Sequence, residues 1–280
     1  HLANATILAI PGIRDKTVSD YTMSRCKDNG QVFYVMDSEI FDENGARIYN
    51  DTKKTPASVR DTSEKLSDRN IDNNFVATYF PDVFIEDTVN NRNVEVPASV
   101  AAVGALGFND SASRPWFAPA GFSRGALGFV TNVKVRLSAG DRDTLYDARI
   151  NPIATFPNAG FVIFGQKNLQ GAKSALDRIN VRRMLIEVKR LVFGVARSIL
   201  FEQNTTATRA RFISQATPLL AMVQAGQGIE QFKIIMDDTN NTVEDVEANR
   251  LNGKIVVVPT RAVEFVAIDF IITATGVSFE

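Results

Sequence analysis

Residues 121–125 read Gly-Phe-Ser-Arg-Gly and match Gly-x-Ser-x-Gly, the spacing with which many serine hydrolases present a nucleophile. In those enzymes the serine lies on a sharp turn between a strand and a helix, and a histidine further along the chain serves as its base. Here Pro115 and Pro119 precede the motif, and a strand-like segment follows it. The chain has a single histidine, His1, which comes before the serine. A hydrolase that uses Ser123 as its nucleophile is therefore a remote alternative.

The favoured interpretation of this segment is a turn-rich loop. Its glycines allow tight backbone bends, and its aromatic residues supply apolar surface. We expect the side chains of Trp116, Phe117 and Phe122 to pack inward. On this interpretation the protein is not an enzyme.

Residues 165–174 follow a predicted strand and are similar to a phosphate-binding loop. The spacing fails, because five residues instead of four separate Gly165 from Gly171. Ala172 also stands where the motif requires its lysine. We therefore expect a surface connection at this point and no nucleotide cofactor.

Residues 236–250 are acidic and raise the question of a calcium site. They lack the central glycine of a calcium-binding loop, and Asn249 stands where the loop needs its last glutamate. A short helix explains them better, with Thr242 as its cap and Glu244 and Asp245 in its first turn. No metal is expected.

The composition is that of an ordinary globular protein. Of 280 residues, 45% are hydrophobic and 22% charged, and the formal net charge is −1. Nothing in this balance favours binding to nucleic acid or to an anionic membrane, and no apolar run reaches the roughly 20 residues that a membrane span needs. The single cysteine, Cys26, excludes an intrachain disulfide and fits a reducing compartment.

The chain opens at His1 without an initiator methionine, so we expect a fragment that lacks an N-terminal part.

Strand and helix patterns alternate along the chain, which predicts an α/β fold with mixed β-sheets flanked by helices. We divide it into an α/β domain over 1–110, with a variable insertion near 38–74, and a C-terminal α/β core domain over 111–280. Strands are predicted at 2–10, 31–37, 75–87, 92–97, 128–137, 160–165, 231–237 and 255–258, and helices at 15–29, 57–67, 97–107, 138–149, 181–200, 206–225 and 242–250.

The segment from Ala262 to Ile272 predicts a long strand whose two faces are both mostly apolar. Such a strand must be covered on both sides. It is either central in its own sheet or completes the sheet of another subunit by strand addition.

Six segments along the chain are informative when they are taken together. They are ILAIPGI (7–13), FYVMD (33–37), PAGFSRGAL (119–127), INPIATFPNAGFVIFGQKNL (150–169), INVRRMLIEVKR (179–190) and MDDTNNTVEDVEANRLNGKIVVVPTRAVEFVAIDF (236–270). In this order they resemble the tail sheath proteins of contractile-tailed bacteriophages. The resemblance runs through nearly the whole chain and is weakest over 38–74.

The resemblance implies a structural subunit of a contractile sheath. It implies hexameric rings stacked helically around a tail tube, and a contraction that needs no ATP and drives the tube through the host envelope. The implied partners are the protein itself, the tail tube protein, and the baseplate and tail terminator proteins. The implied location is the virion tail, after assembly in the host cytoplasm. Sheaths of related injection systems, such as a bacteriocin or type VI secretion apparatus, are the alternative.

The resemblance also implies that terminal segments donate strands to neighbouring subunits. We expect this role for Val263, Phe265, Val266, Ile268, Phe270 and Ile272. A second expectation comes from concentrated charge, which suits contacts that break on contraction. It assigns tube-facing or inter-subunit contacts to Arg182, Arg190, Glu244, Asp245 and Arg250.

Overall fold

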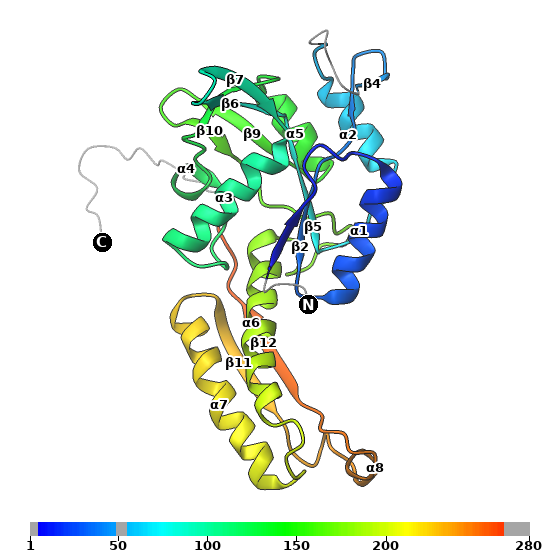
Figure 1. Ribbon diagram of the computed structural model, residues 1–280, viewed down its shortest axis with the longest axis vertical. Coiled ribbons are helices and arrows are strands. Elements are labelled where there is room, and N and C mark those ends of the chain that lie inside the picture. Colours follow the sequence, from blue (N-terminus) through cyan, green and yellow to red (C-terminus); the bar gives the residue numbers. More distant parts are fainter. Residues whose placement is uncertain (1–4, 49–54, 266–280) are drawn as a thin grey trace, which may run out of the picture.

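The computed structural model describes residues 5–48 and 55–265. The chain forms an elongated molecule with two parts stacked along its long axis (Figure 1). The upper part holds the larger sheets, and the lower part holds two long helices and a two-stranded sheet. The fold class is therefore the predicted one, with mixed sheets flanked by helices.

A five-stranded sheet forms the centre of the upper part. Its strands run in the order β1 (Ile7–Ala9), β2 (Phe33–Met36), β5 (Val76–Phe80), β9 (Ile150–Phe156) and β10 (Gly160–Ile163). The first four are parallel, and β10 pairs antiparallel with β9. This sheet confirms the predicted strands around residues 33–36 and 76–80.

Helices cover both faces of this sheet, because its strands carry apolar side chains on both sides. Phe33 and Val35 of β2 pack toward α3 (Ala98–Ala112), while Tyr34 and Met36 pack toward the opposite face. That opposite face is covered by α1 (Lys16–Asn29), α2 (Val59–Ser67) and α5 (Ala139–Asp147).

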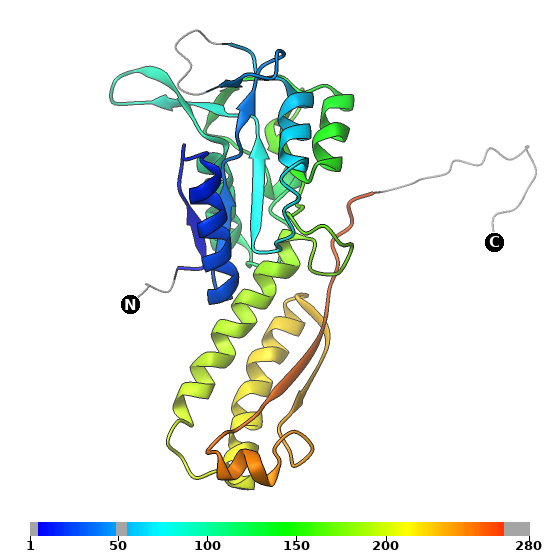
Figure 2. The ribbon, with the colours of Figure 1, turned by 90° about the vertical axis from the view of Figure 1, so that its right-hand side faces the viewer.

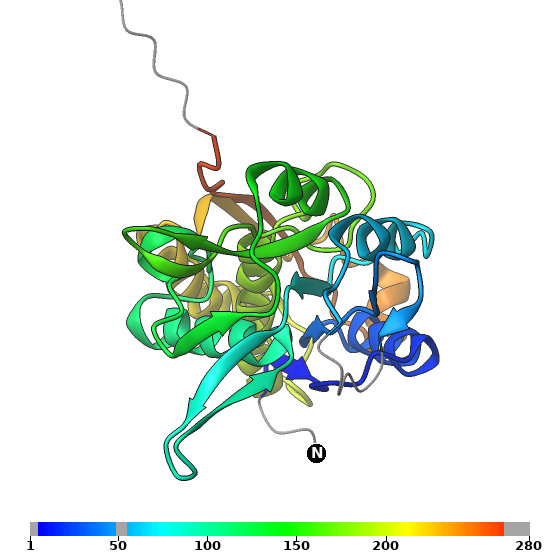
Figure 3. The same ribbon diagram turned by 90° about the horizontal axis from the view of Figure 1, so that it is seen from above.

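Two smaller sheets and a short helix complete the upper part. The three-stranded antiparallel sheet has β6 (Val83–Asp87) between β7 (Arg92–Val96) and β8 (Val130–Val133), and the β6–β7 hairpin projects from the body (Figures 2 and 3). A small hairpin pairs β3 (Ile40–Phe41) with β4 (Arg47–Ile48). The short helix α4 (Gly121–Arg124) lies in the loop between α3 and β8.

The lower part is built on α6 (Ile179–Ser198), which runs from the upper part to the far end of the molecule (Figure 2). It packs against α7 (Thr206–Ala225) and the hairpin of β11 (Ile229–Ile235) and β12 (Lys254–Pro259). At the tip, Thr242 and Asp245 form the capping box of α8 (Val243–Glu247), which confirms the predicted cap. In the part of the chain that the structure describes, no helix is long and apolar enough to cross a membrane.

The division of the chain into domains stays a prediction, and the arrangement of the strands favours a different boundary. The boundary at 110/111 falls inside α3, and the five-stranded sheet takes strands from both sides of it. The packing units meet instead at the start of α6. We therefore propose a boundary near residue 178.

Three other expectations differ from the structure. The segment 150–156 forms β9, although no strand is predicted there. Residues 262–265 form no regular strand, and the rest of the predicted terminal strand lies outside the described residues. The side chain of Phe122 is 56% exposed instead of packed inward. It contacts Phe156 at the surface, with the two ring centroids 5.0 Å apart.

Candidate assembly site around the C-terminal segment

The Gly-x-Ser-x-Gly motif forms α4, and its glycines have structural explanations. Gly121 has a φ of 82°, in the left-handed region that glycine tolerates. A Cβ atom on Gly125 would lie 2.7 Å from the carbonyl oxygen of Ile163 and 2.8 Å from the backbone nitrogen of Gly121. Gly125 also accepts a hydrogen bond from the backbone N–H of Ile163 at 2.8 Å. The motif therefore fastens this loop to β10.

Ser123 lies on the exposed side of this turn. No histidine occurs among residues 5–48 and 55–265, so none of these residues can serve as its base. Trp116 is buried and Phe117 half-buried, as predicted for the aromatic residues of this loop. The geometry of the motif therefore serves packing.

We expect Gly125→Ala to lower the free energy of unfolding by about 2 kcal/mol, because backbone atoms crowd the added methyl group. Ser123→Ala, two residues away, should change it by less than about 0.5 kcal/mol, because its side chain is exposed. Urea denaturation followed by circular dichroism measures both values. Equal effects of the two substitutions would contradict this explanation of the motif.

The connection at 165–174 is partly buried, whereas the sequence predicts a surface loop. Gln166, Asn168 and Leu169 are each less than 5% exposed. The Asn168 side chain donates to the backbone carbonyl oxygens of Asn74 and Leu176, at 3.2 and 2.6 Å. Asn151 of β9 binds both the N–H and the carbonyl oxygen of Lys167. Amide side chains therefore hold the loop in one conformation at the junction of the two parts.

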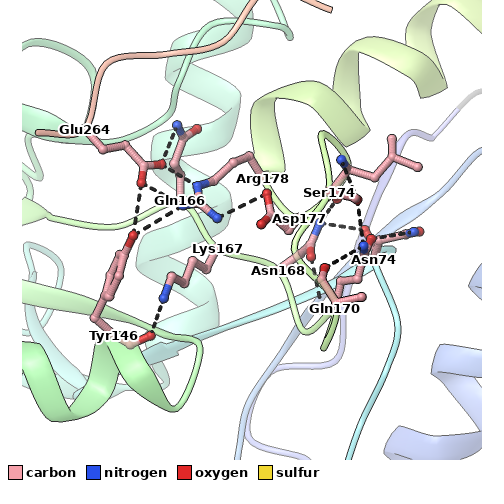
Figure 4. A network of polar contacts seen from close by, with 12 residues as sticks. Asn74, Tyr146, Gln166, Lys167, Asn168, Gln170, Ser174, Asp177, Arg178 and Glu264 are labelled. Carbon is pink, nitrogen blue, oxygen red and sulfur yellow. Dashed lines mark hydrogen bonds and ion pairs between the residues drawn. The ribbon is translucent and has the colours of Figure 1, made fainter.

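This loop, α5 and Arg178, the cap residue of α6, present a set of donors to one carboxylate of the C-terminal segment (Figure 4). Glu264 accepts from Nε and Nη2 of Arg178, at 2.6 and 3.0 Å. It also accepts from Nε2 of Gln166 at 3.1 Å and from the hydroxyl of Tyr146 at 3.2 Å. The two-pronged contact with Arg178 is the geometry in which a guanidinium binds a carboxylate most strongly.

Lys167 holds Tyr146 in place by a contact with the face of its ring. Its Nζ lies 3.2 Å from the ring centroid of Tyr146 and donates to the Tyr146 carbonyl oxygen at 2.8 Å. Burial and the neighbouring charge of Arg178 lower the pKa of Lys167 to about 8. Burial and the charge of Glu264 raise the pKa of the Tyr146 hydroxyl, which therefore remains a hydrogen-bond donor at neutral pH.

A cavity of about 1040 Å³ lies beside this contact and is lined by the loop and the C-terminal segment. Lys173 and Arg261 are exposed on its wall. No group of three histidine, cysteine or acidic side chains that could hold a metal ion occurs among residues 5–48 and 55–265.

The candidate strand-exchange residues fall into two groups. Val263 and Phe265 flank Glu264 and are 80% and 78% exposed. Val266, Ile268, Phe270 and Ile272 lie outside the described residues.

The candidate charged residues are not brought together. Arg182 stacks on the ring of Phe75, 4.1 Å from its centroid, and burial lowers its pKa to about 10. Arg190, further along α6, binds Glu187 of the same helix. The remaining three, Glu244, Asp245 and Arg250, lie at or just beyond α8 at the tip of the lower part.

One charged pair was missed, although its arginine lies on a predicted helix. Arg183 is 3% exposed, where the helical pattern places it on the polar face. Its Nη2 lies 2.5 Å from Oδ2 of Asp110 in α3. No sequence signal marks this pair, because its two residues are 73 positions apart.

Comparison with known proteins identifies sequences and structures that this chain is similar to. No model of a protein family matches the chain. The chain is 36% identical to the tail sheath protein of Vibrio phage KVP40 over 193 residues, 69% of this chain and 29% of that protein. It is 31% identical to the tail sheath protein of Enterobacteria phage T4 over 194 residues, again 69% of this chain and 29% of that protein. The chain thus spans less than a third of the length of these curated relatives.

The fold also recurs in a solved assembly. In the sheath complex of an extracellular contractile injection system, PVC, in its contracted state, the matching chain has a TM-score of 0.79 at 21% identity. The match covers 96% of this chain and 71% of that one. The resemblance noted from the sequence is confirmed: the chain is homologous to the tail sheath proteins of contractile-tailed bacteriophages.

Proposed function

We propose that the chain is part of a structural subunit of a contractile phage tail sheath. The observation that carries this is the 31–36% identity to two phage tail sheath proteins over 69% of the chain. The subunits would form hexameric rings stacked helically around the tail tube. Contraction without ATP would then drive the tube through the host envelope.

A sheath of a related contractile injection system, a bacteriocin or a type VI secretion apparatus, is the second candidate. The fold of the PVC sheath supports it, with a TM-score of 0.79. Identity favours the phage sheath, because the injection-system chain shares only 21% of its residues.

The partners and location follow from this proposal. The subunit would bind copies of itself, the tail tube, the baseplate and the tail terminator, would assemble in the host cytoplasm, and would reside in the virion tail. We retain strand exchange for the segment that begins at Val263. The exposed charges at the tip, Glu244 and Arg250, fit contacts with the tube or a neighbour better than Arg182 does, because Arg182 already packs on Phe75.

Negative-stain electron microscopy of the protein expressed from its complete reading frame tests the proposal. We expect hollow, transversely striated tubes. A protein that stays monomeric, also with the tail tube protein present, would overturn it. A fluorophosphonate probe tests the hydrolase alternative in the same sample, and no labelling of Ser123 is expected.

A further inference from the structure

The C-terminal segment is attached to both parts of the molecule within a few residues. β12 ends at Pro259, and the next backbone N–H, that of Thr260, donates to Gly228 of the lower part at 3.2 Å. Glu264 is bound to Gln166 of the loop and Tyr146 of α5 in the upper part, and to Arg178, the cap residue of α6 at the boundary of the two parts. The segment therefore passes from one part to the other as a short strap beside α6 (Figures 1 and 4).

Apolar packing contributes little to the upper attachment. Val263 and Phe265 on either side of Glu264 are 80% and 78% exposed. By contrast, the Glu264 side chain is only 21% exposed, although it is the charged member of the three. The ring of Phe265 meets that of Tyr146 edge-on, with centroids 6.1 Å apart, a contact worth less than a charge-assisted pair. The carboxylate is thus the main point of attachment.

The site that receives this carboxylate is held by contacts of its own. Arg178 pairs with the neighbouring Asp177 at 3.2 Å. Tyr146 is held by Lys167, and the Gln166 carbonyl oxygen accepts from the N–H of Ile179 at the start of α6 at 2.9 Å. Four donors therefore converge on Glu264 from groups that the rest of the protein positions. Such preorganisation reduces the ordering cost of docking the segment.

We infer that Glu264 is a positioning residue that fastens the C-terminal segment to the body of its own subunit. The chain beyond Glu264, and not the end of β12, is then the part free to reach a neighbouring subunit. This inference deepens the proposed function and rests on it for the exchange itself. It assigns Val263 to the fixed part of the segment and moves the start of any exchanged strand to Phe265 or beyond.

We call the contact between Glu264 and its four donors the anchor. Together with α6, the anchor forms a second connection between the lower part and the upper part. Residues 260–263 form a short connection between two attachment points, Gly228 and the carboxylate site. Rotation of one part against the other would stretch this connection or break the carboxylate contact. The anchor thus limits relative motion of the two parts as well as the exit point of the chain.

Trypsin cleavage after Arg261 measures the anchor directly, because Arg261 is exposed and lies three residues before Glu264. Proteolysis of a folded protein reports how often the segment opens. We expect Glu264→Gln to accelerate release of residues 262–280, detected by mass spectrometry, by about tenfold, since a charge-assisted contact is lost. Glu86→Gln, the same change at an exposed position on β6, is the matched control and should leave the rate unchanged.

A double-mutant cycle with Arg178→Gln shows whether the two groups act together. The double variant should be cleaved no faster than the faster single variant. A wild-type cleavage rate in Glu264→Gln would overturn the inference. Circular dichroism melting of each variant separates a local release from a loss of the whole fold.

Failure of the inference and failure of the proposed function give different results. If Glu264→Gln releases the segment but the complete protein never forms tubes, the anchor stands and the sheath proposal falls. If tubes form and the cleavage rate does not change, the sheath proposal stands and the anchor falls.

Discussion

Replacing Trp116 with alanine is expected to lower the free energy of unfolding by about 3–5 kcal/mol, the usual cost of removing a buried large aromatic side chain. Trp116 belongs to the loop after α3 in the upper part, but its ring is buried in the core of the lower part. Its Nε1 donates to the carbonyl oxygen of Gly226 at 2.6 Å. The substitution therefore removes both a large apolar contact and a hydrogen bond between the two parts.

The backbone around the Trp116 ring cannot easily move to fill the space that the ring would leave. A Cβ atom on Gly226 or Gly228 would lie 2.8 or 2.9 Å from atoms of the Trp116 ring. These glycines bring the backbone against the indole, so a cavity would remain when the ring is removed. Trp116→Phe keeps much of the apolar volume and loses the hydrogen bond, and about 1–2 kcal/mol is expected for it.

Phe122→Ala is the matched control, because Phe122 is an aromatic residue of the same loop that is 56% exposed. We expect a loss of less than about 1 kcal/mol for it. Urea unfolding by circular dichroism gives all three values, and amide exchange in α6 and α7 shows whether the lower part loosens first. A loss below about 1 kcal/mol in Trp116→Ala would refute this role of the ring.

The sequence is sufficient to predict those helices and strands whose hydrophobic pattern matches the side chains that the fold buries. β2 and β5 are apolar on both faces, and both are buried inside the five-stranded sheet as that pattern requires. The helix at 206–225 coincides with α7. The resemblance to sheath proteins came from segments spread along the chain, and the comparisons confirmed it.

No strand is predicted over 150–156, and its Pro152 is a residue that central strands rarely contain. The structure explains why the proline is tolerated. Pro152 pairs with Phe80, the last residue of β5, and the pairing with β10 ends one residue further on at Ile153. Pro152 is thus the last residue paired with β5 and lies just outside the pairing with β10, where a missing N–H costs least.

The candidate site could not be predicted because its contacts join distant positions. Glu264 and Arg178 are 86 residues apart, and neither belongs to a recognisable motif. The sequence also favours a strand over 262–272, since most residues around Glu264 are apolar on both faces of such a strand. Instead, residues 262–265 are irregular, and the partly exposed ion pair between Glu264 and Arg178 attaches them to the rest of the protein.

The second large effect is expected at the N-terminus of α3. The cap residue of this helix is Pro97, whose side chain forms no capping hydrogen bond. Two carboxylates from elsewhere in the chain take over that role: Asp82 accepts from the N–H of Ala98, and Asp37, which follows β2, accepts from that of Ser99. The Asp37 carboxylate accepts from the N–H and hydroxyl of Ser99, at 3.0 and 2.7 Å, and from the N–H of Gly12 at 2.9 Å.

Asp37→Ala should lower the free energy of unfolding by about 2–4 kcal/mol, because it leaves buried donors without an acceptor. Asp245→Ala removes a capping carboxylate from the exposed helix α8 and should cost about 1 kcal/mol. Equal losses for the two variants in urea denaturation would show that burial of the Asp37 contacts does not matter.

The pH dependence of stability shows how the charge of the Asp37 carboxylate, apart from its size and hydrogen bonds, affects the folded protein. Burial raises the pKa of Asp37, while its hydrogen bonds from Gly12 and Ser99 oppose that shift. A raised pKa in the folded state means that the ionised carboxylate is disfavoured there, so protonation stabilises the folded protein relative to the unfolded chain. As the pH falls through the pKa of folded Asp37, the wild type should therefore gain stability relative to Asp37→Asn, whose side chain does not titrate.

The difference in unfolding free energy between the two proteins, measured at neutral pH and at about pH 4, removes the contribution of all other carboxyl groups. If the wild type instead loses stability relative to Asp37→Asn on acidification, the hydrogen bonds outweigh burial, and the pKa of Asp37 is lowered.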